Sequence, residues 1–224
     1  MPKGSNTMAA YRLPFKLDKQ ANNKLSYHIV RAIKHGRVPL IKPPFVNYQC
    51  LYQIPLRSAW DNQTQLELEE AKLFEHKHEL INLTWEWNPN YPYLAAVFKE
   101  WYAANLKRFV HELTYVGLHI QARNTQIPWH NLSVAPPSVY GLAVKNVSCN
   151  MSIRIPITMR ADKYNPKHIK IDKEIMRFSQ GSTAMLMSDE YQCYAKPLPF
   201  WQGEIIVNGL FDIAALKAVG AQVL

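Results

Sequence analysis

Short catalytic motifs are the first thing this sequence lacks. It contains no G-x-S-x-G, no P-loop, no G-x-G-x-x-G and no H-E-x-x-H. Only 8 of its 224 residues are glycine, the residue that loops cradling phosphate groups need. Nucleotide-driven chemistry is therefore not expected, although an active site assembled from residues distant in the sequence leaves no such signature.

Cysteines and long apolar runs are also scarce. The three cysteines, Cys50, Cys149 and Cys193, are far apart and odd in number, which is typical of a reducing compartment. No run approaches the roughly 18 to 20 apolar residues of a membrane span, and the N-terminus lacks the apolar centre of a secretory signal. We expect an intracellular chain without a transmembrane segment. A mitochondrial location stays open, because amphipathic, basic and acid-poor N-termini also serve as import signals.

Basic residues outnumber acidic ones. Lys and Arg number 26 against 17 Asp and Glu, which gives a net charge of +9 and a pI near 9.4. The hydrophobic content of 48% is that of a folded globular protein. A basic surface of this size favours an anionic partner, such as nucleic acid, a membrane face or an acidic protein.

The positive charge is concentrated at the start of the chain. Residues 1–60 hold ten basic side chains and one acid, Asp18, whereas residues 61–112 carry a net charge of −4. We therefore predict two parts: a basic N-terminal segment over residues 1–60, made of a helix and a proline-rich extended arm, and a single α+β domain over residues 61–224.

A basic amphipathic helix is predicted within the first part. Asn22 and Asn23 are suitable N-cap residues and Gly36 is a suitable residue just past the end. Apolar residues fall on one side of the helix, and Lys24, His28, Arg31 and His35 fall on the other. The prolines after Gly36 predict an extended arm over residues 37–45.

In the second part, capping and periodicity predict helices over residues 64–79 and 93–115, a short strand over 81–87, and a terminal helix over 210–219. Strands are predicted over residues 168–178, 184–187, 191–195 and 204–207. The fold class expected is α+β: N-terminal helices and an extended arm packed with a mostly antiparallel C-terminal β-sheet, and a short C-terminal helix.

The clearest strand signal runs from Val147 to Met159, where apolar residues occupy every odd position. The even face carries amides, hydroxyls and Arg154 and Arg160 without a carboxylate. Two interpretations of this face stay open: exposure to water, and contact with RNA or another polar surface. Because proline cannot donate a ladder hydrogen bond, Pro156 predicts an edge strand that a partner subunit could cover, with residues 168–178 as the hairpin partner.

The preferred hypothesis is a non-enzymatic, RNA-associated structural component of a ribonucleoprotein, such as a mitochondrial ribosomal subunit, with RNA and other protein subunits as partners. No catalytic residue, metal site or cofactor is predicted. The candidate RNA- or polyanion-binding residues are Lys16, Lys19, Lys24, His28, Arg31, Lys34, His35, Arg37, Lys42, Arg154, Arg160, Lys163, Lys167 and Lys170.

Two alternatives stay open. One is a self-assembling structural protein of the viral matrix or capsid type, which forms homo-oligomers through the strand that contains Pro156. The other is an enzyme with a dispersed site around His119, His130 and nearby acids such as Glu86.

Overall fold

Two antiparallel sheets form the body of the protein in the computed structural model. It describes residues 10–43, 46–58, 81–82, 86–131, 144–145, 151–157, 159, 167–171, 174–178, 184–187, 192–195, 197, 199 and 201–223. The strand order of the large sheet is β15 (Gln222–Val223), β1 (Ala10–Arg12), β12 (Met185–Met187), β9 (Met151–Ile157), β14 (Gln202–Phe211), β6 (Val110–Gln121), β3 (Leu51–Ser58) and β2 (Leu40–Ile41), and β5 (Glu86–Trp87) also pairs with β3.

The small sheet has the order β11 (Glu174–Phe178), β10 (Lys167–Ile171), β13 (Gln192–Ala195) and β7 (Ile127–Asn131). A separate short parallel pair joins β4 (Ile81–Asn82) to β8 (Val144–Lys145). From β6 onward the chain alternates between the two main sheets: β6, β9, β12 and β14 lie in the large one, and β7, β10, β11 and β13 in the small one. Such alternation is typical of double-sheet jelly rolls.

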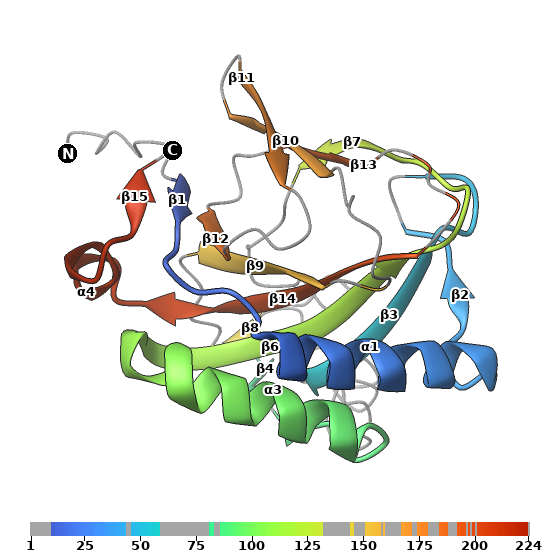
Figure 1. Cartoon of the computed structure of the whole chain (residues 1–224), viewed down its shortest axis with the longest axis horizontal. Helices are drawn as coiled ribbons and strands as arrows, with labels where there is room; N and C mark the ends of the chain where they lie inside the picture. The colour runs from blue at the N-terminus through green and yellow to red at the C-terminus, as the bar shows by residue number, and fades with distance from the viewer. Residues whose placement is uncertain are drawn as a thin grey trace.

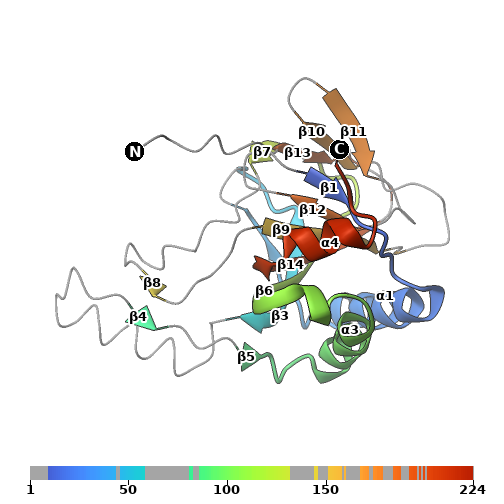
Figure 2. The same cartoon turned by 90° about the vertical axis from the view of Figure 1, so that its left-hand side faces the viewer.

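Helices cover one face of the large sheet. The described residues contain three α-helices, α1 (Lys19–Lys34), α3 (Pro92–Asn105) and α4 (Ile213–Ala218), and a short 3₁₀ turn, η1 (Lys107–Phe109). Helices α1 and α3 lie side by side against the sheet, and the small sheet lies on its opposite side (Figures 1 and 2). None of the helices in the described part of the chain is long and apolar enough to span a membrane.

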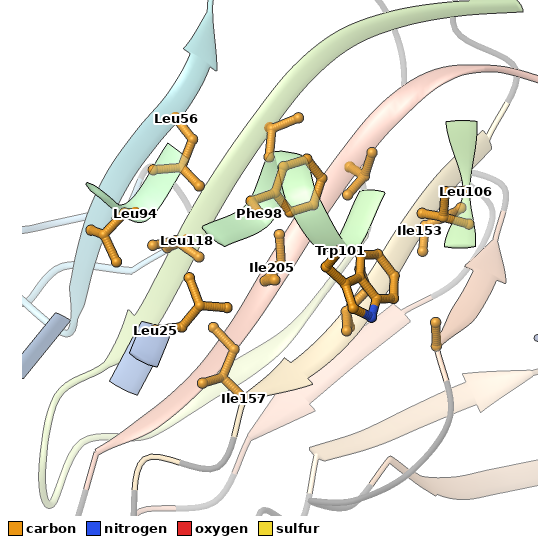
Figure 3. Packing of buried hydrophobic residues seen from close by; sticks show 14 of the residues in the cluster. Leu25, Leu56, Leu94, Phe98, Trp101, Leu106, Leu118, Ile153, Ile157 and Ile205 are labelled. Atoms are coloured by element: carbon orange, nitrogen blue, oxygen red, sulfur yellow. The ribbon is translucent and has the colours of Figure 1, made fainter. Parts of the chain in front are cut away.

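The main hydrophobic core lies between these helices and the large sheet. Phe98 and Trp101 of α3 face sheet residues such as Leu118 and Ile205, as Figure 3 shows, and Leu25 brings α1 into the same cluster. Phe98 is fully buried and its ring lies 5.8 to 6.2 Å from the rings of three other aromatic side chains, Trp87, Trp101 and Tyr102. This packing fixes α1 and α3 against one face of the large sheet.

The predicted class is confirmed in its coarse form, because a mostly antiparallel sheet combines with helices. Helix α1 begins earlier than predicted. Its N-cap is Asp18, whose carboxylate accepts a hydrogen bond from the Ala21 amide at 2.8 Å, and not Asn22 or Asn23. The division at residue 60 stays a prediction, and the helix expected over 64–79 lies outside the described residues.

The long helix predicted over residues 93–115 is wrong in its second half. Helix α3 ends at Asn105, and β6 begins at Val110 after the 3₁₀ turn. The apolar pattern from Val110 to Tyr115 is compatible with both the helical period of 3.6 residues and the strand period of two. Strand β6, however, pairs with both β3 and β14. Pairing on two sides decides the structure, since strand preference depends on tertiary context.

The predicted pairing of the strand around Pro156 is also wrong. Strand β9 is not an edge: it lies between β12 and β14. Residues 167–171 and 174–178, from the predicted hairpin partner, form β10 and β11 of the small sheet. The contact with β12 covers only Ser152 to Arg154, so Pro156 lies past the end of that neighbour, opposite Glu204 of β14. A proline is tolerated there because its nitrogen needs no ladder partner on the open side.

Both faces of β9 are buried. The odd residues Ile153, Ile155 and Ile157 contribute to the helix-covered core, as predicted. Ser152 and Arg154 on the even face are also buried, with 0% and 7% exposure, so the expectation of a face open to water or RNA is wrong. The groups that pair with and cover β9 come from distant parts of the chain, which the sequence pattern of β9 alone cannot reveal.

Candidate functional site between the sheets

The candidate site is the face of the large sheet that points away from the helices. Neighbouring side chains on a strand point to opposite faces of the sheet. In each strand, the residues next to the core residues therefore lie on this face. One row across four strands contains Gln53 of β3, His119 of β6, Glu204 of β14 and Pro156 of β9, which are register partners in turn. Polar groups therefore line the interior between the sheets.

A hydrogen-bonded group of three side chains occupies one end of this row. The Gln53 amide nitrogen donates to the Tyr115 hydroxyl at 2.9 Å, and that oxygen lies 3.3 Å from Nε2 of His119. Which of Tyr115 and His119 donates to the other depends on the tautomer of the imidazole. Gly117, between the two on β6, makes this contact possible, because a Cβ there would overlap the Tyr115 ring.

A buried ion pair occupies the middle of the site. Nη1 of Arg154 on β9 lies 3.4 Å from a carboxylate oxygen of Glu204 on β14, and the two residues are only 7% and 4% exposed. Among the described residues, Nε of Arg154 has no hydrogen-bond partner. The buried guanidinium therefore has one N–H donor that is not satisfied by the described residues.

The electrostatics of the two groups are linked. Burial raises the pKa of the Tyr115 phenol above its ordinary value of 10.0, and the Gln53 hydrogen bond and the charge of Arg154 oppose that rise. The phenol is therefore protonated at neutral pH and can donate. Arg154 can hold an anionic group, and the Tyr115–His119 pair can pass a proton.

The raised pKa predicts a loss of stability at alkaline pH. Above about pH 10 the unfolded chain loses the Tyr115 proton while the folded chain keeps it, so this contribution, complete below that pH, disappears as the pH rises through the folded-state pKa. We expect the free energy of unfolding to fall more steeply above about pH 10 for the wild type than for Tyr115→Phe. Urea unfolding at a series of pH values measures this, and parallel curves would contradict it.

The predicted polyanion-binding residues lie on several elements. Lys19, Lys24, His28, Arg31 and Lys34 lie on α1. Lys16, His35, Arg37 and Lys42 lie in the segments before and after it, and Lys167 and Lys170 lie on β10 of the small sheet. Arg160 and Lys163 fall outside the described residues. Polyanion binding by these residues stays a prediction.

The structure brings only some of these residues together. His28, Arg31, His35 and Arg37 line one groove between α1 and the start of α3. Arg154 is separated from them, because it points to the interior between the sheets.

The residues of the enzyme alternative are also separated. His119 contacts Tyr115, whereas Glu86 is exposed on β5 opposite Ser58. His130 lies on β7 of the small sheet, where its register partner is Cys193 of β13.

The sequence interpretation missed Gln53, Tyr115 and Glu204. Glu204 could have been selected from the sequence, because it is an isolated acid next to the apolar run Ile205-Ile206-Val207 of a predicted strand. The Tyr115-x-Gly-x-His119 spacing is the period of one strand face, but assigning residues 93–115 to a helix concealed it.

No family model matches this chain, and no curated protein matches it in sequence. Solved structures do match. A prolyl hydroxylase from Trichoplax adhaerens, solved with a peptide of the oxygen degradation domain of hypoxia inducible factor, is similar with a TM-score of 0.52 and 8% identity, over 97% of this chain and 89% of that one.

Two further structures match less well. A Pseudomonas putida prolyl-4-hydroxylase has a TM-score of 0.48, 8% identity, and coverage of 90% and 92% of the two chains. A 2OG-Fe(II) oxygenase family oxidoreductase from Burkholderia pseudomallei has a TM-score of 0.45, 8% identity, and coverage of 88% and 94%.

The Trichoplax comparison shows a shared overall fold across nearly the whole of both chains. This fold belongs there to an enzyme, so the hypothesis of a non-enzymatic ribonucleoprotein component, with RNA and other subunits as partners, is wrong. The same finding contradicts the alternative of a viral matrix or capsid protein.

Iron(II) oxygenases hold their metal with two histidines and one carboxylate. Among the described residues, no three His, Cys, Asp or Glu side chains come together in a way that could hold a metal ion. In the interior, His119 contacts Tyr115 and Glu204 contacts Arg154. The described residues therefore do not provide an iron centre by themselves.

Proposed function

We propose that this chain is an oxygenase-type enzyme that binds a 2-oxo acid between its two sheets, with Arg154 as the residue that holds the acid's carboxylate. The observation that carries this proposal is the buried guanidinium of Arg154, whose Nε has no hydrogen-bond partner among the described residues. The fold shared with a prolyl hydroxylase supports the enzyme class.

The Arg154–Glu204 ion pair is expected to contribute little to the stability of the fold. Charge-assisted hydrogen bonds of this type are shorter, at about 2.7 to 2.9 Å, whereas this contact is 3.4 Å long. Removing two charges from water is expensive, and an ion pair of imperfect geometry repays that cost incompletely. The pair is therefore better explained by a role in ligand binding than by stability.

A carboxylate ligand suits the remaining donors. Arginine has five N–H groups in a rigid fork, and Glu204 contacts only Nη1. The edge that includes Nε is left for a bidentate contact with a carboxylate. The charge of Arg154 acts on the pKa of the Tyr115 phenol, and this neutral phenol is a further donor on the same face.

The Tyr115–His119 pair supplies the acid–base part of the proposal. The Tyr115 hydroxyl lies within hydrogen-bond distance of His119 Nε2, so this pair can release or take up a proton beside the bound ligand. The Trichoplax enzyme was solved with a peptide, and a peptide is the second substrate we propose for this chain.

A second candidate is a protein that binds a 2-oxo acid without turning it over. It is favoured by the lack of a three-residue metal-binding group in the described part of the chain.

Calorimetric titration with 2-oxoglutarate, followed by an assay of its consumption with iron(II), oxygen and ascorbate, separates the two candidates. Binding with consumption supports the enzyme. Binding without consumption supports the second candidate. Absence of binding contradicts both.

A further inference from the structure

A second, independent groove lies outside the sheet interior. It has a volume of about 340 Å³ and runs between the second half of α1 and the first turn of α3. Helix α1 and the turn after it provide His28, Arg31, His35 and Arg37, and the opposite wall includes Tyr91 and Tyr93. Its size is within the range of small-molecule sites.

The charge of the groove has one sign. None of the described residues that line it is acidic. Arg31 and Arg37 make no ion pair with any carboxylate of the described chain, where the recorded pair is Arg154 with Glu204. Two guanidinium groups in one concave site attract an anion and can bind it through forked hydrogen bonds.

The position of Arg31 alone has a simpler explanation. It lies in the last turn of α1, where a cation stabilises the C-terminal end of the helix dipole. Arg37 has no such role, because it follows Gly36, which has a φ of 66° and turns the chain away from the helix axis. The Tyr91 hydroxyl donates to the Arg37 carbonyl at 3.1 Å and holds this segment against the other wall.

The groove also offers a flat aromatic surface. The rings of His28 and Tyr93 stack with centroids 5.6 Å apart and an interplanar angle of 5°. Tyr93 is nevertheless 72% exposed, an unusual state for a large aromatic side chain on a helix that otherwise buries its rings. A second ring can pack against this surface while its charged group reaches the arginines.

We propose that the groove binds a small aromatic anion: a flat ring that carries a phosphate or carboxylate group. The ring packs against Tyr93 and His28, and the anionic group contacts Arg31 and Arg37. This site does not depend on the site between the sheets.

Calorimetric titration of the full chain at low salt tests the proposal, with phenyl phosphate and benzoate as probes and inorganic phosphate and phenol as partial ligands. Phenyl phosphate or benzoate should bind saturably and more tightly than either partial ligand. Arg31→Gln and Arg37→Gln should each weaken binding about tenfold, as expected for the loss of a charge-assisted contact, and Tyr93→Ala should weaken it several-fold.

Lys34→Gln is the matched control, because it removes the same charge from the same helix at a residue that does not line the groove. It should leave binding within about twofold, which is the scale of a screened surface charge. No saturable binding of either probe, or an equal loss in Lys34→Gln, would overturn the proposal. Preference between the two probes identifies the anionic group.

Discussion

Replacing Glu204 by alanine should lower the free energy of unfolding by about 3 kcal/mol or more, because it leaves the buried Arg154 guanidinium without its counter-charge. The 3.4 Å contact is long, so the lower end of the usual 3 to 5 kcal/mol range is the expected value. Urea unfolding near neutral pH measures the change.

Two variants control this result. Glu86→Ala removes an exposed carboxylate from β5 and should change stability by less than about 0.5 kcal/mol. The double variant Arg154→Met/Glu204→Leu removes both charges and keeps apolar bulk, so it should be near neutral or more stable than the wild type. If the double variant is as unstable as Glu204→Ala, the ion pair itself does not explain the loss.

Replacing Phe98 by alanine should lower the free energy of unfolding by about 3 to 5 kcal/mol, the range seen for buried aromatic residues. Phe98 is fully buried, and α3 attaches to the large sheet through it (Figure 3). Its removal leaves a cavity lined by the rings of Trp87, Trp101 and Tyr102. Thermal or urea unfolding measures the loss.

Tyr93→Ala on the same helix is the matched control, since Tyr93 is 72% exposed. Its effect should stay within about 0.5 kcal/mol. A loss from Phe98→Ala no larger than that of Tyr93→Ala would mean that α3 does not hold the core together.

Local patterns predicted the elements of the fold well where one face is apolar. The alternation of Ile153, Ile155 and Ile157 and the amphipathic periodicity of α1 both appear in the core. Pairing between distant strands was not predictable, because no local property of β9 indicates that β12 and β14 are its neighbours. Two-sided pairing also overrode the helical pattern that ends at Tyr115.

The candidate site was predictable only in fragments. The sequence interpretation chose Arg154 and His119 but placed them in different hypotheses, because one was assigned to an RNA-binding face and the other to an enzyme. Glu204 meets Arg154 across a strand pair separated by 50 residues. Such a partnership depends on the order of strands in the sheet, which a single sequence does not reveal.

The dissociation constant of 2-oxoglutarate for the wild type and for Arg154→Met/Glu204→Leu is the most direct measure of whether the interior between the sheets is a binding site. The wild type should bind 2-oxoglutarate. The double variant, once circular dichroism has shown that it is folded, should bind at least about tenfold more weakly. Arg31→Gln in the outer groove should bind as the wild type does. Equal affinity of the wild type and the folded double variant would contradict the assignment of Arg154 to the ligand.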